Sequence, residues 1–223
     1  MIKSTKDLFS QWSSRENHIG SVFNCDGVVD KTVWEKQSNQ PRILFVLKEA
    51  WHKKPVEEPI YDLTIDLKEN GPWGLWHRVA EWTRGIILTA QGEDAPYCRL
   101  PKDEANSYLR KIAVINVKKS HGESSSKYDD IMRFAEEDAD LLYEQIKMID
   151  PDIIVCGYTF DFLNKILKRN GEQIIDKTKE NHCDNWHYKW KDRIVLDYYH
   201  PAMQAPNLLL YYGIVGCFKD AIK

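Results

Sequence analysis

The sequence lacks several features that would assign the chain to a broad class at once. No apolar run among its 223 residues approaches the roughly 20 residues of a membrane helix, so no membrane association is expected. The first residues carry charges with no apolar stretch behind them, and so do not predict a secretory signal. The five cysteines are odd in number and scattered, which predicts reduced thiols and a cytoplasmic protein rather than a disulfide framework.

Motifs of several enzyme classes are missing as well. There is no glycine-rich phosphate loop and no Gly-x-Ser-x-Gly segment, so nothing supports a kinase, a dinucleotide-dependent dehydrogenase or a serine hydrolase. His182, Cys183 and His187 lie close together, but their spacing fits no strong zinc signature. We therefore expect neither a metal nor an organic cofactor. The net charge of −3 argues against a generic basic nucleic-acid coat, although an enzyme can touch nucleic acid through one local patch.

Four short apolar runs dominate the pattern that is present. They cover residues 43–47, 111–116, 152–157 and 193–197, and such runs are typical of strands buried on both faces of a parallel sheet. The segments between them carry apolar residues at helical spacing, most clearly over residues 129–149. The pattern predicts an α/β protein with three layers, α/β/α, around a central four-stranded parallel sheet.

The chain has no composition shift, internal repeat or low-complexity segment that would mark a domain boundary. A single domain over residues 1–223 is therefore expected, with residues 1–41 as an N-terminal helical extension whose first helix covers residues 1–24. Residues 51–70 are polar and contain two prolines, which predicts a long loop. A small hairpin is expected around residues 186–190.

Polar residues follow the predicted strands at the points where they end. The first strand leads into Glu49, the second ends in Asn116, and the fourth runs into His200. In a parallel sheet the carboxyl ends lie on one edge, where open α/β proteins bind their ligands. A carboxylate, an amide and an imidazole are therefore expected to converge there, and these three residues become the candidate functional residues.

The order of these segments resembles that of the uracil-DNA glycosylase superfamily, in particular its iron–sulfur-bearing branch. That branch has Gly-Glu-Ala-Pro-Gly after its first strand, where this chain has residues 48–52. A Gly-x-Pro-Phe-x-Gly segment that opens a helix corresponds to residues 70–74. The Asn-Val-Val-Lys segment after the second strand corresponds to residues 116–119.

The later motifs keep the same order. Pro-x-x-Ile-Val-x-x-Gly corresponds to residues 151–157 and His-Pro-Ser to residues 200–202, so the resemblance covers residues 42–222. The branch holds its cluster with four cysteines, including an early Cys-x-x-Cys pair. Cys25 stands alone before the first strand here, and no iron–sulfur cluster is expected. The chain also departs from the branch at Lys48, which replaces a glycine.

The resemblance implies a uracil-DNA glycosylase-like fold and a hydrolase that flips a base out of DNA and cleaves its N-glycosidic bond. Glu49 would activate the attacking water, and His200 would stabilise the leaving base through a hydrogen bond. The implied base-binding residues are Asn116, Trp73 and Ala50. The implied phosphate-binding residues are Lys118, Lys119 and Ser120. The partner would be DNA or a nucleobase-containing ligand, and we expect a monomer.

Other interpretations of the same residues stay open. The fold can also hold a base, nucleotide or single strand without cleaving it, which the altered residues after Glu49 and the acidic balance favour. A hydrolase of a free nucleoside or another small ligand is a third hypothesis. Structural roles are open too: a salt bridge for Glu49, a turn cap for Asn116, a buried hydrogen bond for His200 and core packing for Trp73. The tyrosines at 158, 198 and 199 are interpreted as packing residues.

Overall fold

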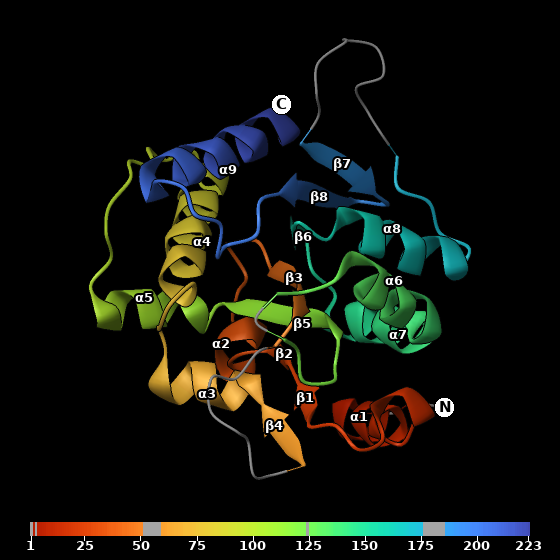
Figure 1. The fold of residues 1–223 in the computed structure, drawn as a ribbon. Coiled ribbons are helices and arrows are strands. Elements are labelled where there is room, and N and C mark those ends of the chain that lie inside the picture. Colours follow the sequence, from red (N-terminus) through yellow and green to blue (C-terminus); the bar gives the residue numbers. More distant parts are fainter. Residues whose placement is uncertain (1, 3, 51–58, 124, 176–185) are drawn as a thin grey trace.

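The computed structural model of the chain describes residues 2, 4–50, 59–123, 125–175 and 186–223. Its main sheet has the strand order β2-β5-β3-β6-β8-β7 (Figure 1). The four predicted strands are its parallel core: β3 (Ile43–Glu49), β5 (Ile112–Lys118), β6 (Ile153–Gly157) and β8 (Arg193–Tyr198). The α/β class is therefore confirmed.

The predicted four-stranded, all-parallel sheet is wrong, because the sheet is mixed and has six strands among the described residues. β2 (Gly27–Val28) pairs antiparallel with β5 at one edge. β7 (His187–Trp190) pairs antiparallel with β8 at the other edge and forms the hairpin expected there. β2 escapes prediction because two residues, one of them a glycine, provide no apolar run.

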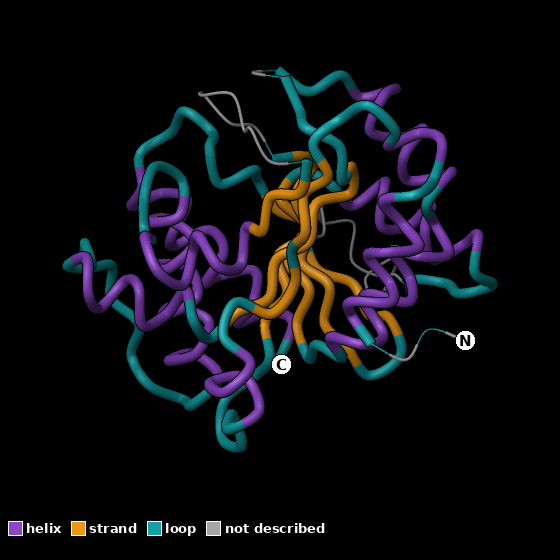
Figure 2. The backbone as a smooth tube through the Cα atoms, turned by 90° about the horizontal axis from the view of Figure 1, so that it is seen from below, coloured by secondary structure: helices purple, strands orange, loops and turns teal. Residues whose placement is uncertain are grey.

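Helices cover both faces of the sheet, as Figure 2 shows. Along β3, Phe45 packs into one core and its neighbours Leu44 and Val46 into the other, because successive side chains of a strand point to opposite faces. One face is covered by α3 (Leu63–Asn70), α4 (Trp76–Ala90), α5 (Lys102–Leu109) and α9 (Asn207–Ala221). The other is covered by α1 (Thr5–Ser13), α6 (Tyr128–Glu137), α7 (Ala139–Ile149) and α8 (Phe160–Arg169).

The N-terminal segment differs from the predicted helical extension. The helix over residues 1–24 is wrong: α1 is followed by a short 3-10 helix (Glu16–His18) and by β1 (Phe23–Cys25). After β2 the chain forms α2 (Lys31–Glu35), which the Asp30 side chain caps. Leu8 and Trp12 are buried as helical spacing requires, but residues beyond the 3-10 helix join strands instead.

Two further boundaries differ from prediction. The described part of the predicted loop over residues 51–70 contains β4 (Ile60–Asp62), which pairs parallel with β1, and then α3. The Asp62 side chain accepts hydrogen bonds from the backbone N–H groups of Thr64 and Ile65 and so begins that helix. The predicted helix over residues 129–149 is divided into α6 and α7 at Asp138, whose buried carboxylate binds His18.

The connections between strands create a topological switch point at the carboxyl edge of the sheet, the kind of place where open α/β proteins form a ligand crevice. The chain leaves β3 through α3, α4 and α5 on one face, and leaves β5 through α6 and α7 on the opposite face. Where neighbouring parallel strands send their connections to opposite faces, their carboxyl ends are left uncovered. β3 and β6 are such neighbours, because β3 leaves through α3–α5 on one face and β6 leaves through α8 on the other. On the other side of β3, Glu49 lies opposite Lys118 of β5 in their register. No helix of the described residues has the length and apolarity required to cross a membrane.

Candidate functional site

Glu49 is the last residue of β3 and lies beside the end of β5. Its carboxylate Oε2 is 3.1 Å from Nζ of Lys118, which is also 2.7 Å from Oδ2 of Asp130 on α6. Burial by itself would lower the pKa of Lys118, but its hydrogen bonds to Asp130 and Glu49 outweigh burial and raise it. Lys118 therefore stays charged and holds two carboxylates together. Its ammonium, predicted to bind phosphate, is shared between these partners.

The backbone at Gly122 lies directly on the Glu49 carboxylate. A Cβ at this position would stand 2.5 Å from both Cγ and Cδ of Glu49. The Gly122 N–H donates to the carbonyl oxygen of Ala50 at 2.8 Å, which fixes the approach. Together with Lys118, this contact leaves the Glu49 side chain only 4% exposed. The carbonyl oxygen of Ala50, a residue predicted to bind a base, is occupied by this hydrogen bond from Gly122.

We predict that Gly122→Ala lowers the free energy of unfolding by about 1–3 kcal/mol, because the new methyl group must displace Glu49. Gly216→Ala is the matched control: a Cβ there meets nothing within 4 Å, and the residue lies inside α9. Alanine is the better helix former, so this control should gain up to about 1 kcal/mol. Urea denaturation followed by circular dichroism compares the two, and equal stabilities would contradict the close contact.

Asn116 lies on β5, two residues before Lys118, and is 1% exposed. Its backbone N–H and its Nδ2 both donate to Oδ2 of Asp26, at 2.7 and 3.2 Å. The other oxygen of Asp26 accepts from Nζ of Lys119 at 2.5 Å. Lys119 is fully buried, with its ammonium over the ring of Trp12, so it has no surface with which to meet a phosphate. Lys119 was predicted to bind phosphate, but in this buried position it cannot reach one.

Ser120, also predicted to bind phosphate, is part of a buried Ser-His-Asp chain. Its Oγ is 2.7 Å from Nδ1 of His18, whose Nε2 is 2.8 Å from Oδ2 of Asp138. Ser120 and His18 are 4% and 2% exposed, so the hydroxyl has almost no surface for a substrate. The chain ties the exit of β5 to the start of α7. His18, Ser120 and Asp138 are separated in the sequence, and no sequence motif predicts their contact.

His200 follows β8 and is held in one orientation. Its Nδ1 accepts a hydrogen bond from the Ala202 N–H at 3.1 Å, so the proton of the neutral ring lies on Nε2. Arg78 on α4 fixes the segment behind it by donating to the carbonyl oxygens of Pro201 and Met203, at 2.6 and 2.7 Å. Burial and, to a lesser extent, the charge of Lys48 lower the pKa of His200 to about 4. The ring is a neutral hydrogen-bond donor at neutral pH.

We predict that NMR titration of His200 gives a pKa of about 4 instead of 6.5, and that Lys48→Met raises it only in part because burial remains. The folded-state pKa lies below the unfolded one, so the unfolded chain takes up this proton first on acidification. The stability that neutral His200 contributes is therefore lost as the pH falls from about 6.5 to about 4. His200→Gln should remove this part of the pH dependence. A pKa at or above 6.5 would contradict the desolvation of the half-buried ring.

Tyr158 and Lys48 belong to the same edge, although sequence analysis interpreted Tyr158 as a packing residue. Tyr158 is 65% exposed and has φ 59°, a left-handed conformation that is uncommon for a residue with a side chain. Its N–H donates to the carbonyl oxygens of Cys156 and Tyr198, which holds the turn after β6. The Lys48 ammonium lies 4.8 Å from the centre of its ring. The exposed Tyr158 ring and the Lys48 cation therefore lie side by side where β3 and β6 end.

Trp73 lies in the turn before α4 and is 38% exposed. Its ring meets that of Trp76 edge to face, with 6.4 Å between the ring centres. Arg78, in the first turn of α4, connects this helix to the segment after His200 by a hydrogen bond to the carbonyl oxygen of Pro201. Trp73 is thus not a core residue, and its ring has free surface near the start of α4.

The fold brings the predicted residues together only in part. Glu49 and Lys118 are in contact, and Asn116 lies on the neighbouring strand. β6 separates β3 from β8, so the ends that carry Glu49 and His200 lie roughly 10 Å apart at about 4.8 Å per strand. Among the described residues no group of three or more His, Cys, Asp or Glu side chains is placed to hold a metal ion, and His182 and Cys183 lie outside them.

Comparison of the chain with protein-family models and with curated proteins found no match in either case.

Proposed function

We propose that the protein is a hydrolase that cleaves the N-glycosidic bond of a nucleobase in DNA. The observation that carries the proposal is the state of His200: a half-buried, neutral imidazole whose Nδ1 accepts from Ala202 and whose Nε2–H has no acceptor within the described part of the chain. A neutral donor suits a leaving base, because negative charge grows on the carbonyl oxygen of the base as the bond breaks. Glu49 on the same sheet edge supplies the carboxylate that such a reaction requires.

In the proposed reaction Glu49 would activate the water and His200 would stabilise the leaving base. A water oxygen attacks the anomeric carbon while the C–N bond breaks, and the electron pair of that bond leaves with the base. The Glu49 carboxylate accepts the water proton and stabilises the oxocarbenium-like transition state. His200 would donate a hydrogen bond to the base oxygen, and Trp73 would hold the ring face. Asn116 is 1% exposed and bonded to Asp26, so it would have to be uncovered before it could read the base edge.

Phosphate contacts require a revision of the residues that the sequence suggests. Lys119 and Ser120 are buried in contacts of their own, and Lys118 is shared between two carboxylates. Lys48 is the better candidate, since its ammonium lies over the exposed Tyr158 ring. An aromatic ring next to a cation also suits a strand whose bases stack and whose phosphates need a counter-charge.

A second function has a specific observation in its favour. Glu49 is 4% exposed, paired with Lys118 and covered by Gly122, as a carboxylate with a structural role would be. The same edge would then bind a nucleobase-containing ligand without cleaving it. Hydrolysis requires Glu49 to be uncovered when the substrate binds, whereas a binding module does not.

A cleavage assay on labelled oligonucleotides decides between the two. Single- and double-stranded substrates would carry uracil, hypoxanthine or a mismatched thymine, and alkali would convert abasic sites into strand breaks. The proposal requires breaks with one of these bases and none with the folded double variant Glu49→Gln/His200→Ala. Salt-dependent binding of the same strands without product would favour the binding module. Cleavage of a free nucleoside but not of DNA would assign the site to small ligands.

A further inference from the structure

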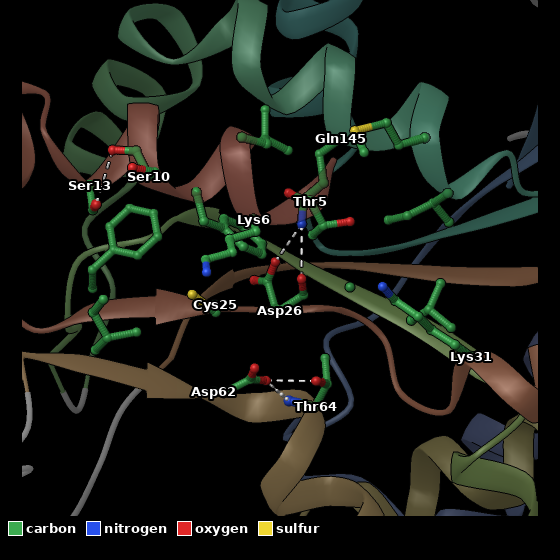
Figure 3. A pocket seen from close by; sticks show the side chains of 18 of the residues that line it. Thr5, Lys6, Ser10, Ser13, Cys25, Asp26, Lys31, Asp62, Thr64 and Gln145 are labelled. Atoms are coloured by element: carbon green, nitrogen blue, oxygen red, sulfur yellow. Dashed lines mark hydrogen bonds between the residues drawn. The ribbon is translucent and has the colours of Figure 1, made fainter. Parts of the chain in front are cut away.

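A cavity of about 740 Å³ lies away from the sheet edge that carries Glu49 and His200. Its walls come from α1, α2 and α7 and from the segments around β1, β2 and β4. Figure 3 shows residues of α1 along one side, Cys25 and Asp26 across the middle, and Asp62 and Thr64 on the opposite side. The volume is within the range of about 300–1,000 Å³ that is usual for small-molecule pockets.

The cavity wall is mainly apolar. Its apolar side chains include Leu8, Phe9, Phe23, Val28, Trp34 and Ile149. Trp34 and Phe23 are nearly buried, at 5% and 3% exposure, so the aromatic surface is held in place by the core. An apolar wall of this kind favours a flat hydrocarbon or aromatic body rather than a sugar or a free phosphate.

Gln145 gives the cavity a polar anchor. This residue of α7 is 2% exposed, and its Nε2 donates to the backbone oxygen and to Oδ1 of Asp26, at 3.1 and 2.9 Å. These bonds orient the carboxamide, while its Oε1 is buried without a hydrogen-bond partner among the described residues. A buried acceptor without a donor is unfavourable by about 1–3 kcal/mol. An N–H or O–H group of a ligand would satisfy it.

Two exposed lysines at the opening offer an anion a counter-charge. Lys6 and Lys31 line the cavity, both are exposed, and neither forms an ion pair within the part of the chain that is described. Of the facing carboxylates, Asp26 is paired with Lys119. Asp62, which accepts the hydrogen bonds that begin α3, and Glu35 keep their charges, so the cavity as a whole has no excess of positive charge and an anion would be bound locally, at one of the lysines. Burial and the nearby Asp26 and Asp62 raise the pKa of Cys25 to about 12, so its thiol is no nucleophile. The cavity is therefore suited to reversible binding.

We propose that this cavity binds a planar aromatic acid that carries a ring N–H. The ring would lie on the apolar wall, the N–H would donate to Oε1 of Gln145, and the carboxylate would meet Lys6 or Lys31. The inference is independent of the proposed hydrolase, since it uses no residue of the sheet edge that carries Glu49 and His200.

Two probes of nearly the same shape test the proposal on the full chain. Indole-2-carboxylate has the ring N–H, and 1-benzothiophene-2-carboxylate has a sulfur atom in its place. In isothermal titration calorimetry we expect saturable binding at one site, with the indole bound about tenfold more tightly because only it satisfies Gln145. The double variant Lys6→Gln/Lys31→Gln should weaken both probes.

The controls keep the test decisive without disturbing the core. Met148→Trp places a larger ring into the opening at a residue that is 43% exposed, and should abolish binding. Ile222→Trp makes the same kind of change at a 48% exposed residue beyond α9, and should bind like the natural chain. Equal affinity for the two probes would overturn the proposal, as would binding that survives Met148→Trp.

Discussion

Replacing Asp26 by alanine is expected to destabilise the chain by about 3–5 kcal/mol, a large part of the roughly 5–15 kcal/mol that a domain of this kind has. The carboxylate is fully buried and accepts from Lys119, Gln145 and both nitrogens of Asn116. Its loss leaves the ammonium of Lys119 buried without a counter-charge. Urea denaturation followed by circular dichroism measures the change.

The matched variants separate the buried charge from the other contacts. Asp26→Ala/Lys119→Met removes both charges and should recover much of the loss, and it remains measurable if the single variant does not fold. Lys147→Gln breaks an ion pair whose two side chains are 44% and 41% exposed, and should change stability by less than about 1 kcal/mol. An Asp26→Ala variant as stable as Lys147→Gln would show that the buried pair contributes little.

The same variant should respond to pH in a defined direction. Burial lowers the pKa of Lys119 below its ordinary 10.5, although the charge of Asp26 opposes this. Without Asp26 the pKa falls further, so between that value and 10.5 the unfolded chain binds the lysine proton and the folded chain does not. Stability of Asp26→Ala should therefore rise as the pH is raised toward 10.5.

Asp26 also illustrates what local sequence can and cannot reveal. Asp26-Gly27 is a turn signal in the sequence, but the chain continues there without a turn, from Phe23 opposite Ser120 to Gly27 opposite Val114. Nothing nearby indicates that the partners of Asp26 lie 90, 93 and 119 residues further along the chain. The four parallel strands were predictable because each is a continuous apolar run that must be buried. β1, β2 and β4 have two or three residues each and depend on their neighbours.

In the candidate site, too, some features are visible in the local sequence and others depend on tertiary packing. Strand ends are visible in a sequence, and parallel pairing makes Glu49 and Lys118 neighbours, so this part of the site was predictable. Lys118 and Lys119 look equivalent in the sequence, yet Lys118 is shared by the carboxylates of Glu49 and Asp130, whereas Lys119 is enclosed with Asp26. Adjacent strand residues point to different surroundings, and only the packing of α1 and α6 decides which lysine is enclosed.

Glu49→Gln is expected to have the largest effect on activity if the proposed hydrolysis is correct. The amide keeps the size of the side chain but neither takes up the water proton nor stabilises the positive charge on the sugar. We expect the single-turnover rate of base release to fall by about 10²- to 10⁴-fold. Rapid-quench measurement with enzyme in excess reports this step without interference from product release.

Asp130→Asn is the control that separates a catalytic from a structural role of Glu49. Asp130 and Glu49 share Lys118, at 2.7 and 3.1 Å, so each variant removes one of the two carboxylates that neutralise the same ammonium. A structural role would make the two changes similar, with comparable losses in stability and in rate. A catalytic role would make them diverge: Asp130→Asn should keep the rate within several-fold, whereas Glu49→Gln should not. If both variants cleave alike, the Glu49 carboxylate serves to hold Lys118, and the site binds its ligand without cleaving it.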